Sequence, residues 1–181
     1  VMSGQAVSLF SLSIPNYQLV VGMAEELVES NTDNGDGTFT YNVPVREGYT
    51  WSDGSPITAN DWEFTFDTVK SLSLGGNFLS SYPYSCEDEE GTAKNCVVSV
   101  VASDDYTVSI TFNYDPGLST WQYGTAQGIA FSKAYWEQYA TDKETLYAHD
   151  ATNAPVASAF VYDKLEQGAF YTWKYDANTM W

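Results

Sequence analysis

Basic residues are scarce in this sequence. Its 181 residues include seven Lys and Arg against 24 Asp and Glu, which gives a formal net charge of −17 at pH 7. Arg46 is the only arginine and His149 the only histidine. Nucleic-acid binding needs clustered basic side chains that displace counterions, and the basic residues here are scattered. We therefore expect no nucleic-acid partner and attribute the acidity to a solvated surface kept in solution by repulsion.

Long apolar runs are also missing. A membrane-spanning helix needs about 18 or more predominantly apolar residues in a row, and the sequence has no such run. We expect a chain that does not span a membrane. Residues 1–4 have neither the basic nor the apolar segment of a signal peptide. Either the signal has been removed or the chain is an excised piece.

Motifs of the common enzyme classes are absent too. The sequence has no Gly-x-Ser-x-Gly turn, Walker loop or glycine-rich dinucleotide turn. Ser-His-Asp chemistry would have to use His149. The acidic clusters at residues 87–90 and 104–105 could supply the carboxylate pair of a secreted hydrolase, but their turn-rich surroundings favour exposed loops. We expect no enzyme and no catalytic residue, with the hydrolase kept as a rival hypothesis.

Metal-binding patterns are weak. Asn34, Asp36 and Gly37 have the spacing of a calcium loop, but Thr32 stands at the first ligand position and Val43 at the twelfth, where Glu is expected. A hairpin turn explains this segment better. We expect neither a metal nor a cofactor.

Cysteine is limited to Cys86 and Cys96, in an acidic loop that contains glycine. Two cysteines cannot complete a four-ligand zinc site in a sequence with one histidine. In an oxidising compartment they would pair, and a loop this short would be stabilised by roughly 3 kcal/mol in the chain-entropy model. In the cytosol they would be two free thiols. We predict the disulfide.

Turns and alternating strands dominate the rest of the chain. Phe39, Tyr41 and Val43 alternate with polar residues after an Asp-Gly turn, which predicts a half-buried strand in a hairpin. Thr58 can cap a helix with Asp61 three residues on, and helical spacing extends this helix to about residue 72. Helices are further predicted over residues 5–14, 118–124, 132–139 and 142–149. Residues 19–30 should lead into a strand, and residues 73–96 should form a long loop. Two more hairpins are predicted, one of 97–102 with 107–114 and a final one of 157–165 with 169–175. This pattern is α+β: an antiparallel sheet of hairpins with helices packed on one side, in a single domain over residues 1–181.

Aromatic residues make up 16% of the chain, and many of them must belong to a core. Tyr82 and Tyr84 lie in a loop with Ser and Pro, where aromatic rings often wall a ligand site. Trp121 and Tyr123 are weaker candidates for the same role. Many of the other rings belong to a core, and Phe39, Trp62, Phe66 and Phe112 are assigned to it.

One segment of about forty residues carries a specific pattern. Asp-Gly-Thr-Phe-Thr-Tyr at 36–41 is followed by Arg-Glu-Gly at 46–48 and by Trp-Ser-Asp-Gly-Ser-Pro-Ile-Thr-Ala-Asn-Asp at 51–61. This resembles the signature segment of the family 5 extracellular solute-binding proteins, the oligopeptide-, dipeptide- and nickel-binding components of ABC importers. The resemblance continues more loosely to the final hairpin. There residues 157–160 lack the glycines and the proline of the family's turn.

The resemblance implies a subdomain of a clamshell (type II) binding protein, mainly the small N-terminal-side one, with the other lobes absent. It implies that the full-length protein captures a solute, most often a peptide, and closes around it. The full-length protein would be extracellular or periplasmic and held by a lipid anchor. It would hand the solute to an ABC permease in the membrane. One face of this chain would then be unusually apolar, because it packs against a missing lobe.

By their position in the family, Phe78, Tyr82 and Tyr84 lie in the region that reaches the ligand. Together with Trp121 they are the candidate ligand-binding residues. The residues that match the family motif are assigned structural roles in turn, cap and core: Arg46, Trp51, Asp53, Gly54, Thr58 and Asp61. The acidity and the aromatic content leave one further alternative, a carbohydrate-binding domain of a secreted protein.

Overall fold

A computed structural model of the chain describes residues 4–166 and 168–177. The strands are β1 Val7–Ser8, β2 Phe10–Leu12, β3 Leu19–Val21, β4 Thr32–Asp33, β5 Phe39–Pro44, β6 Val97–Asp104, β7 Thr107–Phe112, β8 Ile129–Ala130, β9 Phe160–Glu166 and β10 Phe170–Tyr175. The helices are α1 Ala59–Ser71, α2 Asn77–Ser81, α3 Gly117–Tyr123, α4 Lys133–Trp136 and α5 Lys143–Ala148, with single 3-10 turns at Thr125–Gln127 and Ala151–Asn153. None of the helices in these ranges is long and apolar enough to cross a membrane.

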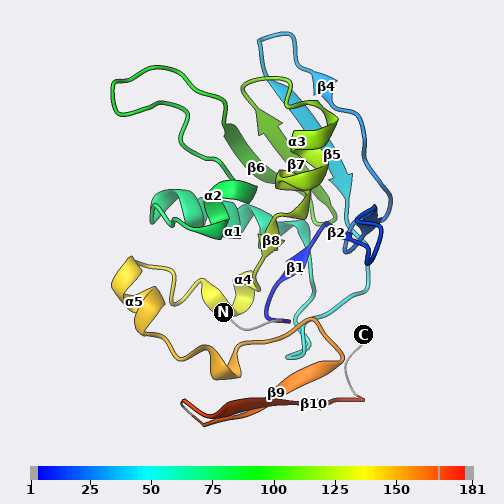
Figure 1. The fold of residues 1–181 in the computed structure, drawn as a ribbon, viewed down its shortest axis with the longest axis vertical. Coiled ribbons are helices and arrows are strands. Elements are labelled where there is room, and N and C mark those ends of the chain that lie inside the picture. Colours follow the sequence, from blue (N-terminus) through cyan, green and yellow to red (C-terminus); the bar gives the residue numbers. More distant parts are fainter. Residues whose placement is uncertain (1–3, 167, 178–181) are drawn as a thin grey trace.

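A four-stranded antiparallel sheet in the order β4-β5-β7-β6, called the central sheet below, is the largest sheet among the described residues. The pairs β1-β8, β2-β3 and β9-β10 form separate two-stranded ladders. In Figure 1 the β9–β10 hairpin lies at the end of the molecule opposite the four-stranded sheet. The α+β class and the two hairpins predicted for β6–β7 and β9–β10 are confirmed.

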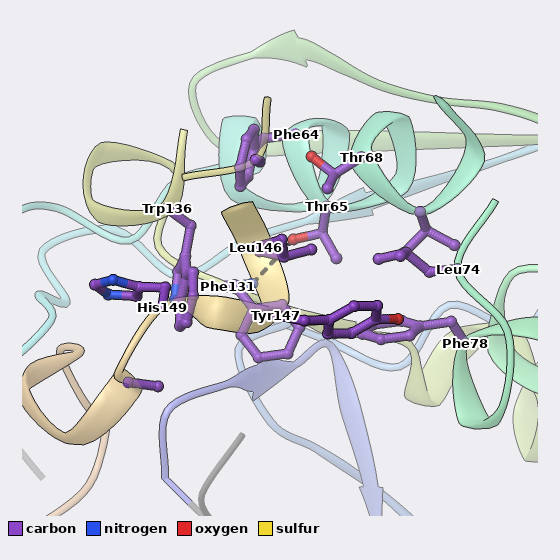
Figure 2. Close-up of a pocket in the computed structure, with 13 residues that line it drawn as sticks. Phe64, Thr65, Thr68, Leu74, Phe78, Phe131, Trp136, Leu146, Tyr147 and His149 are labelled. Carbon is purple, nitrogen blue, oxygen red and sulfur yellow. Dashed lines mark hydrogen bonds between the residues drawn. The ribbon is translucent and has the colours of Figure 1, made fainter. Parts of the chain in front are cut away.

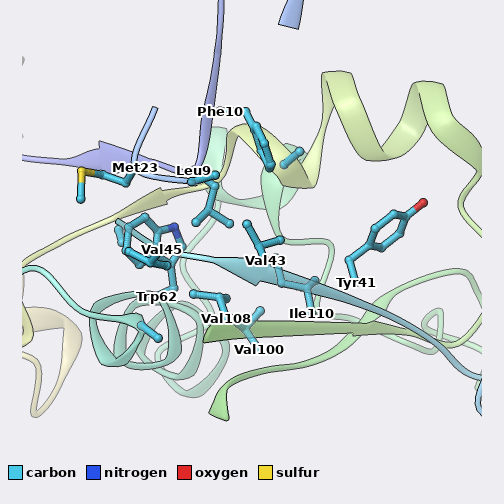
Figure 3. Close-up of a cluster of buried hydrophobic side chains, with 14 of the residues drawn as sticks. Leu9, Phe10, Met23, Tyr41, Val43, Val45, Trp62, Val100, Val108 and Ile110 are labelled. Atoms are coloured by element: carbon cyan, nitrogen blue, oxygen red, sulfur yellow. The ribbon is translucent and has the colours of Figure 1, made fainter. Parts of the chain in front are cut away.

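The central sheet has one apolar and one polar face, as strict alternation requires. Tyr41 and Val43 of β5 are buried opposite Ile110 and Val108 of β7, and Figure 3 shows these side chains in one cluster. On the other face hydroxyl and amide groups pair instead, with Thr40 Oγ1 3.0 Å from Thr111 Oγ1 and Ser109 Oγ donating to Asn42 Oδ1 at 2.6 Å.

Among the described residues, helices α1 and α3 cover the apolar face of this sheet. Helix α1 turns Trp62, Phe66 and Val69 toward the core, and each of them is at most 1% exposed. Helix α3 covers the same face through Trp121, whose ring stacks on Tyr41 at a centroid distance of 3.9 Å. The predicted arrangement of helices on one side of a hairpin sheet is therefore confirmed.

The prediction of a helix over residues 5–14 is wrong. This segment forms β1 and β2, which pair with β8 and β3. The ladder partners come from residues 129–130 and 19–21, so tertiary pairing overrides a local pattern that was ambiguous between the two structures. Elsewhere the errors concern length: the helix predicted over 132–139 is limited to α4, the 19–30 segment contributes only β3, and the 73–96 loop contains α2.

Candidate functional site

The segment from Trp51 to Asp61 is a turn followed by a helix start. Asp53 Oδ1 accepts from the backbone N of Ser55 at 3.0 Å and from its hydroxyl at 2.6 Å. Gly54 has φ +86°, a conformation that side chains other than glycine adopt only at a cost. The turn is anchored to a distant segment, because Ser52 exchanges two hydrogen bonds with the backbone of Val156.

Asp61 connects this turn to two helices. Its carboxylate accepts from Trp51 Nε1 at 3.3 Å, from the backbone N of Thr58 at 3.0 Å and from the backbone N of Lys133 at 2.8 Å. The side chain is only 3% exposed, and burial raises the pKa of its carboxyl above the ordinary value, against the effect of these three donors. These three contacts join the turn at Trp51, the start of α1 at Thr58 and the start of α4 at Lys133.

The remaining motif residues also have structural surroundings. Trp51 is 1% exposed in the core. Arg46 is half-buried, and its backbone N donates to Met23 O at 2.9 Å, which joins the end of β5 to the segment after β3. The roles of these residues in turn, cap and core stay a prediction.

Two of the four candidate ligand-binding residues lie in the core. Tyr82 and Trp121 are both 0% exposed. The Tyr82 hydroxyl donates to Ile129 O at 3.2 Å, burial raises the pKa of this hydroxyl, and Trp121 Nε1 donates to Val28 O at 2.6 Å. The sequence predicted a loop at Tyr82. In the structure Tyr82 follows α2 and its ring packs against Phe66, with 5.8 Å between the ring centroids. In this conformation neither ring presents a surface to a solute.

Phe78 and Tyr84 are partly exposed, and of the two Phe78 lines a pocket. The Tyr84 hydroxyl donates to Leu74 O at 3.3 Å. Leu74 and Phe78 line a cavity of about 220 Å³ together with residues of α1, α4 and α5. Figure 2 shows it, and its walls include Phe64, Thr65, Thr68, Phe131, Trp136, Leu146, Tyr147 and His149. Sequence reasoning identified Phe78 but missed the rest, because these residues are far apart in the chain.

The acidic loop is closed by a disulfide. Cys86 and Cys96 are bonded, with a sulfur–sulfur distance of 2.02 Å, so the predicted pairing is present. Asp88 turns the loop by accepting from the backbone N atoms of Glu90 and Thr92, and the hydrogen bonds from Thr92 lower the pKa of this exposed carboxyl. The carboxylates of residues 87–90 and 104–105 are exposed. Within the described ranges no group of three His, Cys, Asp or Glu side chains could hold a metal ion.

The arrangement of these elements matches part of several solved structures. The oligopeptide-binding protein AppA of Bacillus subtilis, solved in complex with a nonapeptide, matches 96% of this chain with a TM-score of 0.66 and 17% identity. A periplasmic oligopeptide-binding protein of an oligopeptide ABC transporter from Thermotoga maritima matches 97% with a TM-score of 0.66 and 20% identity. The chain covers only 31% and 28% of those chains. The chain therefore has the fold of about one third of those longer chains.

Sequence similarity identifies the family. The family described as bacterial extracellular solute-binding proteins, family 5 (middle) matches residues 22–181, and this chain belongs to it. A probable ABC transporter-binding protein of Deinococcus radiodurans is 29% identical over 102 residues, and the oligopeptide-binding protein OppA of Bacillus subtilis is 30% identical over 99 residues. These matches cover 55% and 51% of this chain but only 15% and 17% of the relatives. The chain thus spans a small part of the length of its curated relatives.

Proposed function

We propose that this chain is the small subdomain of the substrate-binding component of an ABC importer, which captures a solute outside the cytoplasm and delivers it to a permease. The observation that carries the proposal is the family match over residues 22–181, joined to a fold that matches oligopeptide-binding proteins over nearly the whole chain. In this role the protein binds and releases its solute without changing it, so we propose no catalytic residue.

The proposed solute is a short peptide. The matched relatives include an oligopeptide-binding and a dipeptide-binding protein of Bacillus subtilis. Oligosaccharide is the second candidate, because the Thermotoga maritima protein was also solved with mannohexaose. Within this chain, the partly exposed Phe78 and Tyr84 remain our candidates for contact with the solute.

The surface of the chain fits a subdomain that packs against another lobe. In the β9–β10 hairpin the rings of Phe160, Phe170, Tyr171 and Tyr175 are between 43% and 65% exposed. Large exposed apolar surface generally marks an interface. We propose that the other lobe of the importer protein covers this hairpin, and that a lipid anchor holds the full-length protein outside the cell or in the periplasm.

Titration calorimetry of the longer protein that contains this chain tests the proposal. One titrant is a pool of peptides of two to five residues, and the matched control is a pool of oligosaccharides of similar mass. Saturable heat with the peptides alone supports peptide import, and heat with the oligosaccharides alone changes the solute class. No heat with either pool would contradict the proposed binding role.

A further inference from the structure

Both candidate residues for solute contact adjoin the cavity that α1, α4 and α5 help to line, called the α1 pocket below. Phe78 is part of its wall, and the Tyr84 hydroxyl donates at 3.3 Å to the backbone O of Leu74, another residue of that wall. The sequence selected Phe78 and Tyr84, whereas the pocket follows from the packing of the helices. Because these independent observations meet at one place, the α1 pocket is a candidate part of the solute site.

The α1 pocket has room for one ring-sized or branched side chain. Its volume is about 220 Å³, and an apolar engineered cavity of about 150 Å³ binds benzene. Tyr147 is part of the wall and is 70% exposed, so the pocket opens to the surface beside this residue. Figure 2 shows Phe64, Phe131 and Leu146 in other parts of the wall. A side chain of a peptide can therefore enter while the peptide backbone stays outside.

The wall of the α1 pocket suits an uncharged occupant. Among the described residues that line it, none is Asp, Glu, Lys or Arg. His149 also lines it, but its ring stacks on Tyr139 at a centroid distance of 3.5 Å and its Nε2 lies 3.0 Å from the Tyr135 hydroxyl. A charged group that moves into such surroundings loses its hydration without a compensating partner. An apolar side chain is stabilised by the same transfer, because its surface is removed from water.

We propose that the α1 pocket holds one large apolar side chain of the imported peptide, of the size of Leu, Met or Phe. The protein would then select peptides that carry such a residue at one fixed position. This assignment rests on the proposed function, because the occupant is part of the solute.

A set of related peptides tests the proposal on the protein in its natural length. Penta-alanine is the reference, and each of the other peptides carries Phe, Leu, Glu or Lys in place of one alanine, at each position in turn. Titration calorimetry measures the dissociation constant of every peptide. We expect one position at which Phe and Leu tighten binding about tenfold or more relative to alanine. Glu and Lys at that position should bring no such gain.

Two alanine variants separate the α1 pocket from its surroundings. Ala140 lines the pocket, so Ala140→Leu takes up part of its volume and should reduce the preference for Phe to less than about threefold. Ala148 is exposed in α5 and does not belong to the lining. Ala148→Leu is the matched control and should keep the full preference for Phe.

A measurement on the unchanged protein does not depend on how a variant folds. Its leucine methyl groups are labelled with ¹³C, and the signals of Leu146 are identified by their loss in Leu146→Met. Nuclear Overhauser effects should join these methyl groups to the ring protons of the peptide that carries Phe at the preferred position.

Three results would overturn the proposal, and they separate it from the proposed function. Equal affinities for the Phe peptides and for penta-alanine would remove the selectivity of the α1 pocket but leave peptide import unchallenged. A preference for Phe that survives Ala140→Leu, with no Overhauser effect at Leu146, would place the peptide side chain elsewhere. The absence of binding for every peptide would overturn the proposed function as well.

Discussion

The central sheet and the β9–β10 hairpin are built from similar local sequence but have opposite surroundings. In β5 and β7 the inward side chains are buried beneath α1 and α3, as with Val43 and Ile110. In the hairpin large rings such as Tyr171 and Tyr175 stay more than 60% exposed. Alternating aromatic and β-branched residues are therefore enough to form a ladder in both places, but only the central sheet has a second layer to pack against. Two isolated strands are marginally stable at best, so we expect the central sheet to determine the stability of the chain.

The largest difference in stability should come from replacing one tryptophan in each region by alanine. Trp62→Ala in α1 removes a fully buried ring from the core and should lower the free energy of unfolding by about 3–5 kcal/mol. Trp173→Ala in β10 removes a half-buried ring that contacts Tyr162 and should cost less than about 1 kcal/mol. Urea unfolding followed by far-UV circular dichroism measures both. Equal costs would show that the hairpin is part of the cooperative core.

Breaking the disulfide should have the next largest effect. The double variant Cys86→Ala with Cys96→Ala frees a short loop next to β6, and the unfolding free energy should fall by about 3 kcal/mol. Reductant should produce a similar loss in the unchanged chain and none in the variant. A chain that is as stable without the bond would mean that the central sheet already holds the loop.

Asp61→Asn tests the connection between the turn and the two helices. An amide cannot accept all three hydrogen bonds of the carboxylate, so we expect a loss of about 1–3 kcal/mol at neutral pH. Because burial raises the pKa of Asp61, the native state holds its proton more firmly than the unfolded state. The stabilising contribution of Asp61 to the free energy of unfolding is therefore full below its ordinary pKa of 3.8. It decreases as the pH rises through the raised pKa of the native state.

The stability difference between the unchanged chain and Asp61→Asn should therefore narrow as the pH rises from the acid side. Comparing the two proteins at each pH removes the contribution of the other carboxyl groups. Chemical unfolding at a series of pH values measures the difference. A difference that is constant, or that widens with pH, would contradict a raised pKa.

The smallest effect comes from two glycines with the same backbone geometry. Gly54 has φ +86° in the turn before α1, and Gly168 has φ +80° in the hairpin turn. Gly54→Ala should lower the unfolding free energy by about 1–2 kcal/mol because the side chain strains this conformation. Gly168→Ala carries the same strain outside the core and should leave the main transition unchanged. Thermal unfolding of both variants decides whether the two turns differ in this way.

The same contrast explains what the sequence could predict. Periodicity and capping residues found α1 and the hairpins, because alternation and the Thr58–Asp61 spacing act over a few residues. They did not find β1 and β2, whose partners lie elsewhere in the chain. The pocket was not predicted for a similar reason. Phe78 was identified as a candidate ligand-binding residue, but Trp136 and Leu146 come close to it only through the packing of α4 and α5 on α1. Tyr82 was placed in a loop because its burial depends on Phe66 of α1 and on residues 128–129, which are distant in the sequence.

Native mass spectrometry of the protein in its natural length, purified gently, tests the central claim most directly. If the chain is part of a peptide importer, the spectrum should contain a ladder of added masses that match short peptides. A clean unliganded mass that does not shift with peptide pools or with glycans would contradict a binding role for this protein.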